Sequence, residues 1–78
     1  MKYKFTRTQE ETLELLAHGY TNEDMAKHLN KSVRTIEDRL SKIKDKIKAE
    51  TGETLNHRAL AIFAYQYIEA NGGLPDED

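Results

Sequence analysis

The residues best suited to bind a ligand are the basic and hydroxyl side chains gathered between residues 27 and 48. This segment holds eight lysines and arginines against three aspartates and glutamates, which gives a local charge of +5. Lysine and arginine neutralise phosphates and release the counterions of a nucleic acid. Serine and threonine hydroxyls donate hydrogen bonds to phosphate oxygens. The segment therefore offers the chemistry of phosphate-backbone binding.

The net charge of the whole chain, −2, argues at first against a nucleic-acid partner. Residues 1–26 carry three basic against five acidic side chains, and residues 49–78 carry one against six. The positive charge is thus confined to one segment, and this asymmetry can create a local attractive potential that the net charge hides. A solvated, lysine-rich helix explains the same charges without a partner, so composition alone leaves both interpretations open.

Other chemistries find little support in the sequence. His18, His28 and His57 are too scattered to form a metal site, and a surface or capping role is the simpler interpretation. Ser32 and Ser41 have no histidine partner suggested by their spacing, so nucleophilic catalysis is not indicated. We therefore expect neither an enzyme nor a cofactor.

The length and the absence of cysteine bound the kind of protein. The 78 residues suffice for one domain, which we expect to span residues 1–78. Without cysteine there are no disulfides and no thiolate metal sites, so a reducing compartment fits. No apolar run approaches the roughly 20 residues needed to cross a membrane, and residues 1–7 do not have the pattern of a signal peptide. We expect a cytoplasmic protein.

Four helices are predicted from capping residues and apolar periodicity, which makes the fold class all-α. Thr6 begins a capping box, and Thr21, Ser32 and Asn56 are N-caps for the later helices. A frayed acidic tail is expected over residues 74–78. The predicted helices cover, approximately, residues 7–18, 22–29, 33–50 and 57–70.

The helix predicted over residues 33–50 has one apolar and one polar side. Its apolar residues recur at spacings of 3, 4, 3 and 4 and form a narrow stripe: Val33, Ile36, Leu40, Ile43 and Ile47. The opposite side carries Arg34, Asp38, Ser41 and Asp45. A short helix and a very short turn precede it. This is the order of a helix-turn-helix, in which the second helix enters the major groove.

Particular stretches of the chain resemble a known family. They are Phe5-Thr6, residues 13–26 with the turn Gly19-Tyr20-Thr21-Asn22, the start of the third helix at Ser32 and Thr35-Ile36, and residues 55–62. Together they resemble the LuxR-type, or GerE-like, DNA-binding domain over residues 5–68. The resemblance implies a four-helix domain that binds double-stranded DNA as a transcription regulator, usually as a homodimer on paired half-sites.

Carried over by position, the resemblance implies roles for individual side chains. The phosphate contacts of the family fall on Arg34, Thr35 and Arg39, and its third helix touches base edges at Glu37, Asp38 and Ser41. With the neighbouring hydroxyl and basic side chains, the predicted DNA-binding set is Ser32, Arg34, Thr35, Glu37, Asp38, Arg39, Ser41, Lys42 and Lys46. The fourth helix of the family often supplies the dimer contact, which here falls on Phe63, Ala64, Tyr67 and Ile68.

The sequence departs from the family pattern in three places. The family usually has a basic residue where this chain has Glu37, and a neutral or basic one at Asp38. Carboxylates can accept a hydrogen bond from cytosine N4 but repel phosphates, so we expect modest affinity. Lys31 stands where the family usually has an apolar residue. Extra residues between Ile47 and Leu55 predict a longer third helix or a wider loop.

Two other functions remain open from the sequence. The domain could be an adaptor or antagonist that keeps the fold, has lost its DNA contacts and binds RNA polymerase or another regulator. Glu37, Asp38 and the overall acidity motivate this alternative. Residues 35–40 also resemble the promoter-reading domain of sigma factors, although the long fourth helix with Tyr67 and Ile68 favours the LuxR-type interpretation.

Overall fold

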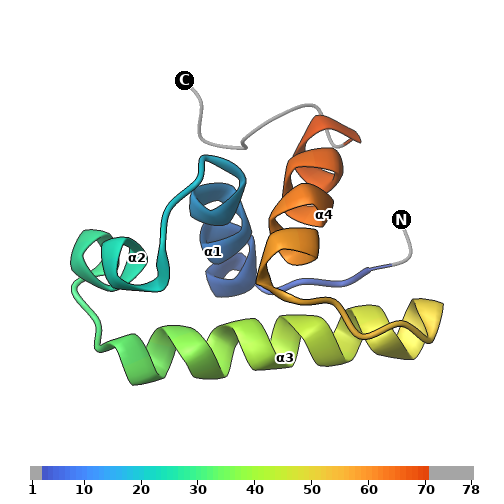
Figure 1. The fold of residues 1–78 in the computed structure, drawn as a ribbon, viewed down its shortest axis with the longest axis horizontal. Coiled ribbons are helices and arrows are strands. Elements are labelled where there is room, and N and C mark those ends of the chain that lie inside the picture. The colour runs from blue at the N-terminus through green and yellow to red at the C-terminus, as the bar shows by residue number, and fades with distance from the viewer. Residues whose placement is uncertain (1–2, 71–78) are drawn as a thin grey trace.

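Four α-helices and no strand make up the described part of the chain, residues 3–70 of a computed structural model (Figure 1). All four predicted helices are present, and only the ends of the first and third differ from the prediction, each by one residue. The tail predicted over residues 74–78 lies outside the described residues. The helices are α1 (Arg7–Ala17), α2 (Asn22–Leu29), α3 (Val33–Thr51) and α4 (His57–Ala70).

Local hydrogen bonds explain where the helices begin. The Thr6 hydroxyl accepts a hydrogen bond from the Gln9 main-chain N–H at 3.1 Å, and Gln9 Oε1 accepts one from the Thr6 N–H at 2.9 Å. This reciprocal pair satisfies donors that a helix start otherwise leaves without partners. The other helices begin at side chains that accept from the main-chain N–H three residues on, namely Thr21, Ser32 and Asn56.

The turn between α2 and α3 depends on a left-handed residue. Asn30 caps α2 with φ 58°, and the next N–H, that of Lys31, donates to the Ala26 carbonyl oxygen at 2.8 Å. Asparagine tolerates this conformation better than most residues with a Cβ. Gly52, with φ 79°, ends α3 in the same conformation. With Asn30 in this conformation, the chain passes from the end of α2 at Leu29 to the start of α3 at Val33 through three residues.

The core lies between α3 and the other three helices, α1, α2 and α4. α3 contributes Ile36, Leu40, Ile43 and Ile47, each at most 4 % exposed. Val33, predicted for the same stripe, is 37 % exposed because it stands at the first position of α3, before the packed part of the stripe. The other helices contribute fully buried side chains to this core, among them Leu13, Leu16, Met25, Leu60 and Ala64.

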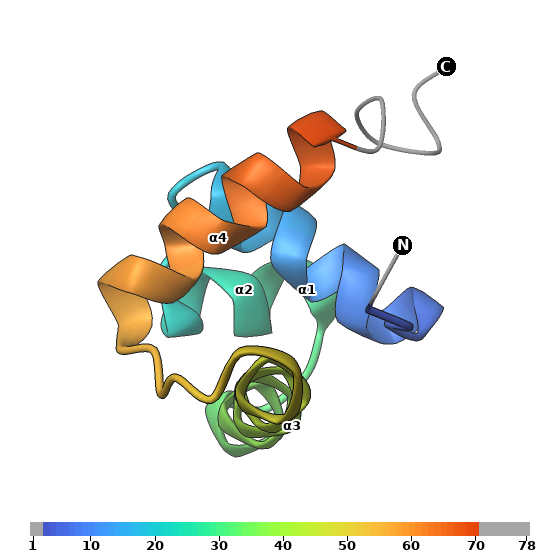
Figure 2. The same ribbon diagram turned by 90° about the vertical axis from the view of Figure 1, so that its right-hand side faces the viewer.

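α3 forms the base of the molecule. In Figure 2, which looks along α3, the helices α1, α2 and α4 all lie on one side of it. Figure 1 shows α3 extending beneath all three, from below α2 to beyond α4. Its 19 residues correspond to a rod of about 28 Å. One long side of α3 is therefore uncovered, while the opposite side is fixed to the core.

Candidate nucleic-acid interface

The start of α3 is organised by two hydroxyl side chains. The Ser32 hydroxyl accepts from the Thr35 N–H at 3.1 Å and lies 3.0 Å from Thr35 Oγ1. Ser32 is exposed and Thr35 is half-buried. A helix N-terminus carries a partial positive charge and main-chain N–H groups that point outward. The turn after α2 thus presents hydroxyls and N–H donors at the end of the uncovered side of α3.

Burial fixes the direction in which each α3 side chain points. Successive residues are about 100° apart around a helix. Asp38 is two residues from both Ile36 and Leu40, which are buried, and therefore lies about 200° round the helix from each. Its side chain is exposed on the uncovered side. The exposed residues in line with it form what we call the outer ridge: Arg34, Asp38, Ser41 and Asp45.

Three other predicted DNA-binding residues lie on the flanks of the outer ridge. Glu37 is about 100° from the buried Ile36, so its exposed carboxylate points sideways along one flank. Arg39 and Lys42 lie on the opposite flank, where Lys42 is exposed and Arg39 is half-buried. The uncovered side of α3 thus has cations on its ridge and beside it, with carboxylates between them.

Lys46 differs from the other predicted residues because its ammonium group has partners within the chain. Lys46 Nζ donates to the Lys4 main-chain oxygen at 2.6 Å and to Gln9 Oε1 at 2.8 Å. It also lies 5.7 Å from the centroid of the Phe5 ring. These contacts hold the segment before α1 against α3. The ammonium group of Lys46 is thus engaged within the chain, and its contact with DNA stays a prediction.

The residues predicted for the dimer contact on α4 fall on different sides of the helix. Ala64 is completely buried, so its side chain has no surface for a partner. Phe63 and Tyr67 are half-buried, and both pack edge-to-face on Tyr3 and Phe5. Their rings hold the segment before α1 against α4.

The exposed apolar surface of α4 is formed by other residues. Ile62 is 53 % exposed and Tyr65 is 56 % exposed. The sequence analysis did not place Ile62 on this surface. The signal was available, because Ile62 lies two residues from both Leu60 and Ala64 and so points away from the core. Ile68 is half-buried beside this surface.

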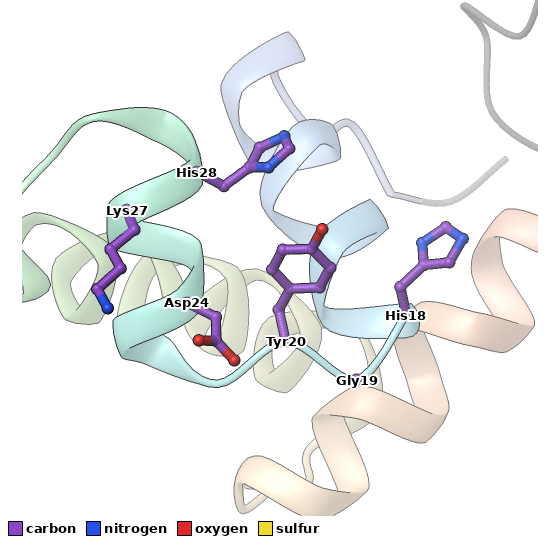
Figure 3. Close-up of a pocket in the computed structure, with 6 residues that line it drawn as sticks. All are labelled: His18, Gly19, Tyr20, Asp24, Lys27 and His28. Atoms are coloured by element: carbon purple, nitrogen blue, oxygen red, sulfur yellow. The ribbon is translucent and has the colours of Figure 1, made fainter.

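An open depression at the turn between α1 and α2 does not gather reactive groups. The Tyr20 and His28 rings meet edge to face with centroids 5.6 Å apart, and His18 Nδ1 lies 2.9 Å from the Glu14 carbonyl oxygen. In Figure 3 the two histidines lie on different sides of Tyr20. Within residues 3–70 no group of three His, Cys, Asp or Glu side chains is placed to hold a metal ion. The lining residues are His18, Gly19, Tyr20, Asp24, Lys27 and His28.

A short helix, a three-residue turn and a long helix with one uncovered side define a helix-turn-helix domain. The family model GerE, of the bacterial regulatory proteins of the luxR family, matches residues 4–59. The chain therefore belongs to the LuxR family, whose helix-turn-helix domains are DNA-binding regulators. No curated protein and no solved structure matches the chain. No helix in the described part is long and apolar enough to span a bilayer.

Proposed function

We propose that this protein is a transcription regulator that binds double-stranded DNA with the outer ridge of α3 in the major groove. The uncovered side of α3 is the observation that supports this proposal most directly, because a helix can enter the groove only where nothing covers it. The major groove is about 12 Å wide and admits one α-helix. The inner side of α3 is fixed by four buried side chains, so the ridge is presented in one orientation.

Phosphate contacts and base contacts then fall to different parts of this surface. Arg39 and Lys42 lie on a flank, where a helix in the groove meets a DNA strand. Ser32 and Thr35 offer hydroxyls at the start of α3, and Arg34 adds a cation at the near end of the ridge. Base edges face the middle of the surface, where the side chains are Asp38 and Ser41, and Glu37 lies beside them on one flank.

Dimerisation through α4 is the second part of the proposal. Ile62 and Tyr65 form an exposed apolar pair on a helix whose opposite side is buried. Aromatic and aliphatic side chains of this kind form the centres of protein interfaces. With Ile68 beside them, they offer a second copy of the chain a surface at which to pair. Phe63 and Tyr67 pack against Tyr3 and Phe5 within the chain, and Ala64 is buried, so this surface does not depend on them.

The test of DNA binding removes positive charge from α3 and measures the salt dependence of affinity. Replacing Arg34 and Arg39 together with alanine should weaken binding and lower the slope of log K against log salt by up to about two units. The matched control replaces both with lysine, which keeps the charge and should keep the slope. An alanine pair that binds DNA as tightly as the original chain would contradict docking through α3.

A protein-binding adaptor is a second candidate, favoured by the carboxylates of Glu37 and Asp38 on the uncovered side of α3. Such an adaptor would use the same side of α3 to bind RNA polymerase or another regulator. It predicts no retention of any duplex at about 0.1 M salt, a concentration at which regulators of this kind bind non-specific DNA through phosphate contacts alone.

A further inference from the structure

We propose that Asp38 selects a cytosine in each half-site by accepting a hydrogen bond from its N4 amino group. This inference rests on the proposed function, because it requires α3 in the major groove. It assigns the base-reading role to the ridge residue Asp38 and not to Glu37 beside it. The class of DNA that the protein prefers is thereby defined by at least one C·G pair at a fixed position.

The burial of its neighbours fixes the direction in which Asp38 points. Ile36 and Leu40, the buried residues on either side of it, are 0 % and 4 % exposed, so the helix cannot turn Asp38 away from the uncovered side without exposing them. Glu37 lies three residues from Leu40 and one from Ile36, which directs its side chain toward the wall of a groove. The floor of the groove is where the base edges lie, and Asp38 points to it.

The hydrogen-bonding groups of the major groove determine which bases a carboxylate can contact. A carboxylate is an acceptor only. Guanine presents N7 and O6 and thymine presents O4, all of them acceptors, so a carboxylate is repelled by both bases. Only cytosine N4 and adenine N6 carry donors there. An exposed carboxylate on the ridge therefore disfavours guanine and thymine through charge and hydrogen-bonding pattern alone.

Adenine is the weaker of the two remaining choices. Its N6 donor lies between two acceptors, its own N7 and the O4 of the paired thymine. The cytosine N4 donor has an acceptor on one side only, the O6 of the paired guanine. A carboxylate that approaches adenine thus meets more negative partial charge than one that approaches cytosine. Cytosine is the base that Asp38 fits.

The positive charge of Arg34 reduces the repulsion that the Asp38 carboxylate would meet from DNA phosphates. Arg34 lies four residues before Asp38 on the same ridge, a separation of about 6 Å along the helix axis. Its guanidinium offsets the repulsion between the carboxylate and the phosphates of both strands. The two side chains lie less than two base-pair steps apart along the helix axis, so Arg34 can contact a phosphate close to the pair that Asp38 reads. The combination weakens non-specific binding while it keeps the specific contact.

The experiment is a selection of random duplexes at about 0.1 M salt, carried out with the whole chain and with two matched variants. Asp38→Asn keeps the shape but exchanges the acceptor pair for an amide, which pairs with adenine N6 and N7. Glu37→Gln removes the same charge one residue away. Both residues are exposed, and thermal melts followed by circular dichroism check that the variants fold.

We expect the original chain to select a motif with one cytosine favoured by about tenfold in each half-site. Asp38→Asn should replace that cytosine with adenine and leave the other positions unchanged, whereas Glu37→Gln should leave the whole motif unchanged. Asp38→Asn should also bind random duplex more tightly, because a repelling charge is gone.

Four results would overturn the inference. A motif without cytosine, or a cytosine that persists in Asp38→Asn, would show that Asp38 does not read a base. A cytosine lost only in Glu37→Gln would give the role to Glu37. The absence of any retained duplex would overturn the proposed function as well. That outcome differs from the other three, because they still return a DNA motif.

Discussion

Lys46 Nζ on α3 lies 2.6 Å from the main-chain oxygen of Lys4, a residue 42 positions earlier in the chain. The same nitrogen donates to Gln9 Oε1 at 2.8 Å, and Gln9 also closes the capping box of α1. One lysine therefore joins α3, the start of α1 and the segment before it. Its place on a basic helix flank suggests a DNA contact, but its contacts give it a structural role.

Replacing Lys46 with alanine should lower the free energy of unfolding by about 1 kcal/mol, since one partly buried and one exposed charge-assisted hydrogen bond are lost. Urea unfolding measures this. The salt slope of DNA binding should stay the same. Lys42→Ala is the control, because Lys42 is exposed on the same flank. It should leave stability unchanged and lower the slope by about one unit. The reverse pattern would return Lys46 to the DNA surface.

Replacing Tyr65 with aspartate should weaken self-association by at least about tenfold, because an aromatic anchor is exchanged for a charge that would be buried between two copies. Sedimentation equilibrium over a range of concentrations measures the change. Thr54→Asp adds the same charge at an exposed position in the loop before α4 and should have no effect. Dimers that survive Tyr65→Asp would move the interface away from Ile62 and Tyr65.

Burial raises the pKa of Tyr67 above its ordinary value of 10.0, and the charge of Glu10 and a hydrogen bond to it raise the pKa further. Tyr67 Oη donates to Glu10 Oε2 at 3.4 Å. The folded chain thus keeps this proton to higher pH than the unfolded chain does. The stability that this difference contributes is present below pH 10 and is lost as pH rises through the raised pKa.

We therefore expect Glu10→Gln to lower the pKa of Tyr67, measured by phenolate absorbance during alkaline titration. The pKa of Tyr65 is also raised, first by its hydrogen bond to Glu69. Glu69→Gln serves as the control, because it should lower the pKa of Tyr65 and leave Tyr67 unchanged. If Glu10→Gln changes neither titration, the contact between Tyr67 and Glu10 does not form in solution.

Replacing Thr6 with alanine should cost about 1 kcal/mol of unfolding free energy, because the Gln9 N–H loses its acceptor. Thr8→Ala, two residues later and also exposed, keeps its main-chain acceptor for the Thr12 hydroxyl and should cost less than half as much. Denaturant unfolding of the two variants gives the comparison. Equal losses would mean that the capping box does not stabilise α1.

Features that depend on residues close in the sequence could be predicted. Features that depend on contacts between distant parts of the chain could not. The Thr6 capping box and the buried stripe of α3 follow from spacings of three and four residues, so both could be read in advance. The hydrogen-bond partners of Lys46 could not be predicted, because they depend on where the segment before α1 packs. Ala64 was predicted for the dimer contact from the family resemblance, although its spacing of four residues from Leu60 already indicates the buried side of α4.

In α3, packing against the core and the proposed contact with DNA belong to different residues. The four buried apolar side chains of α3 point into the core, and every ridge side chain points out of it. Because α3 cannot roll on its axis without exposing Ile36 or Ile43, its sequence preference can change only by exchange of ridge side chains. Such exchanges leave the packing intact. The architecture therefore allows new target sequences to evolve, or to be engineered, one exposed position at a time without a loss of stability.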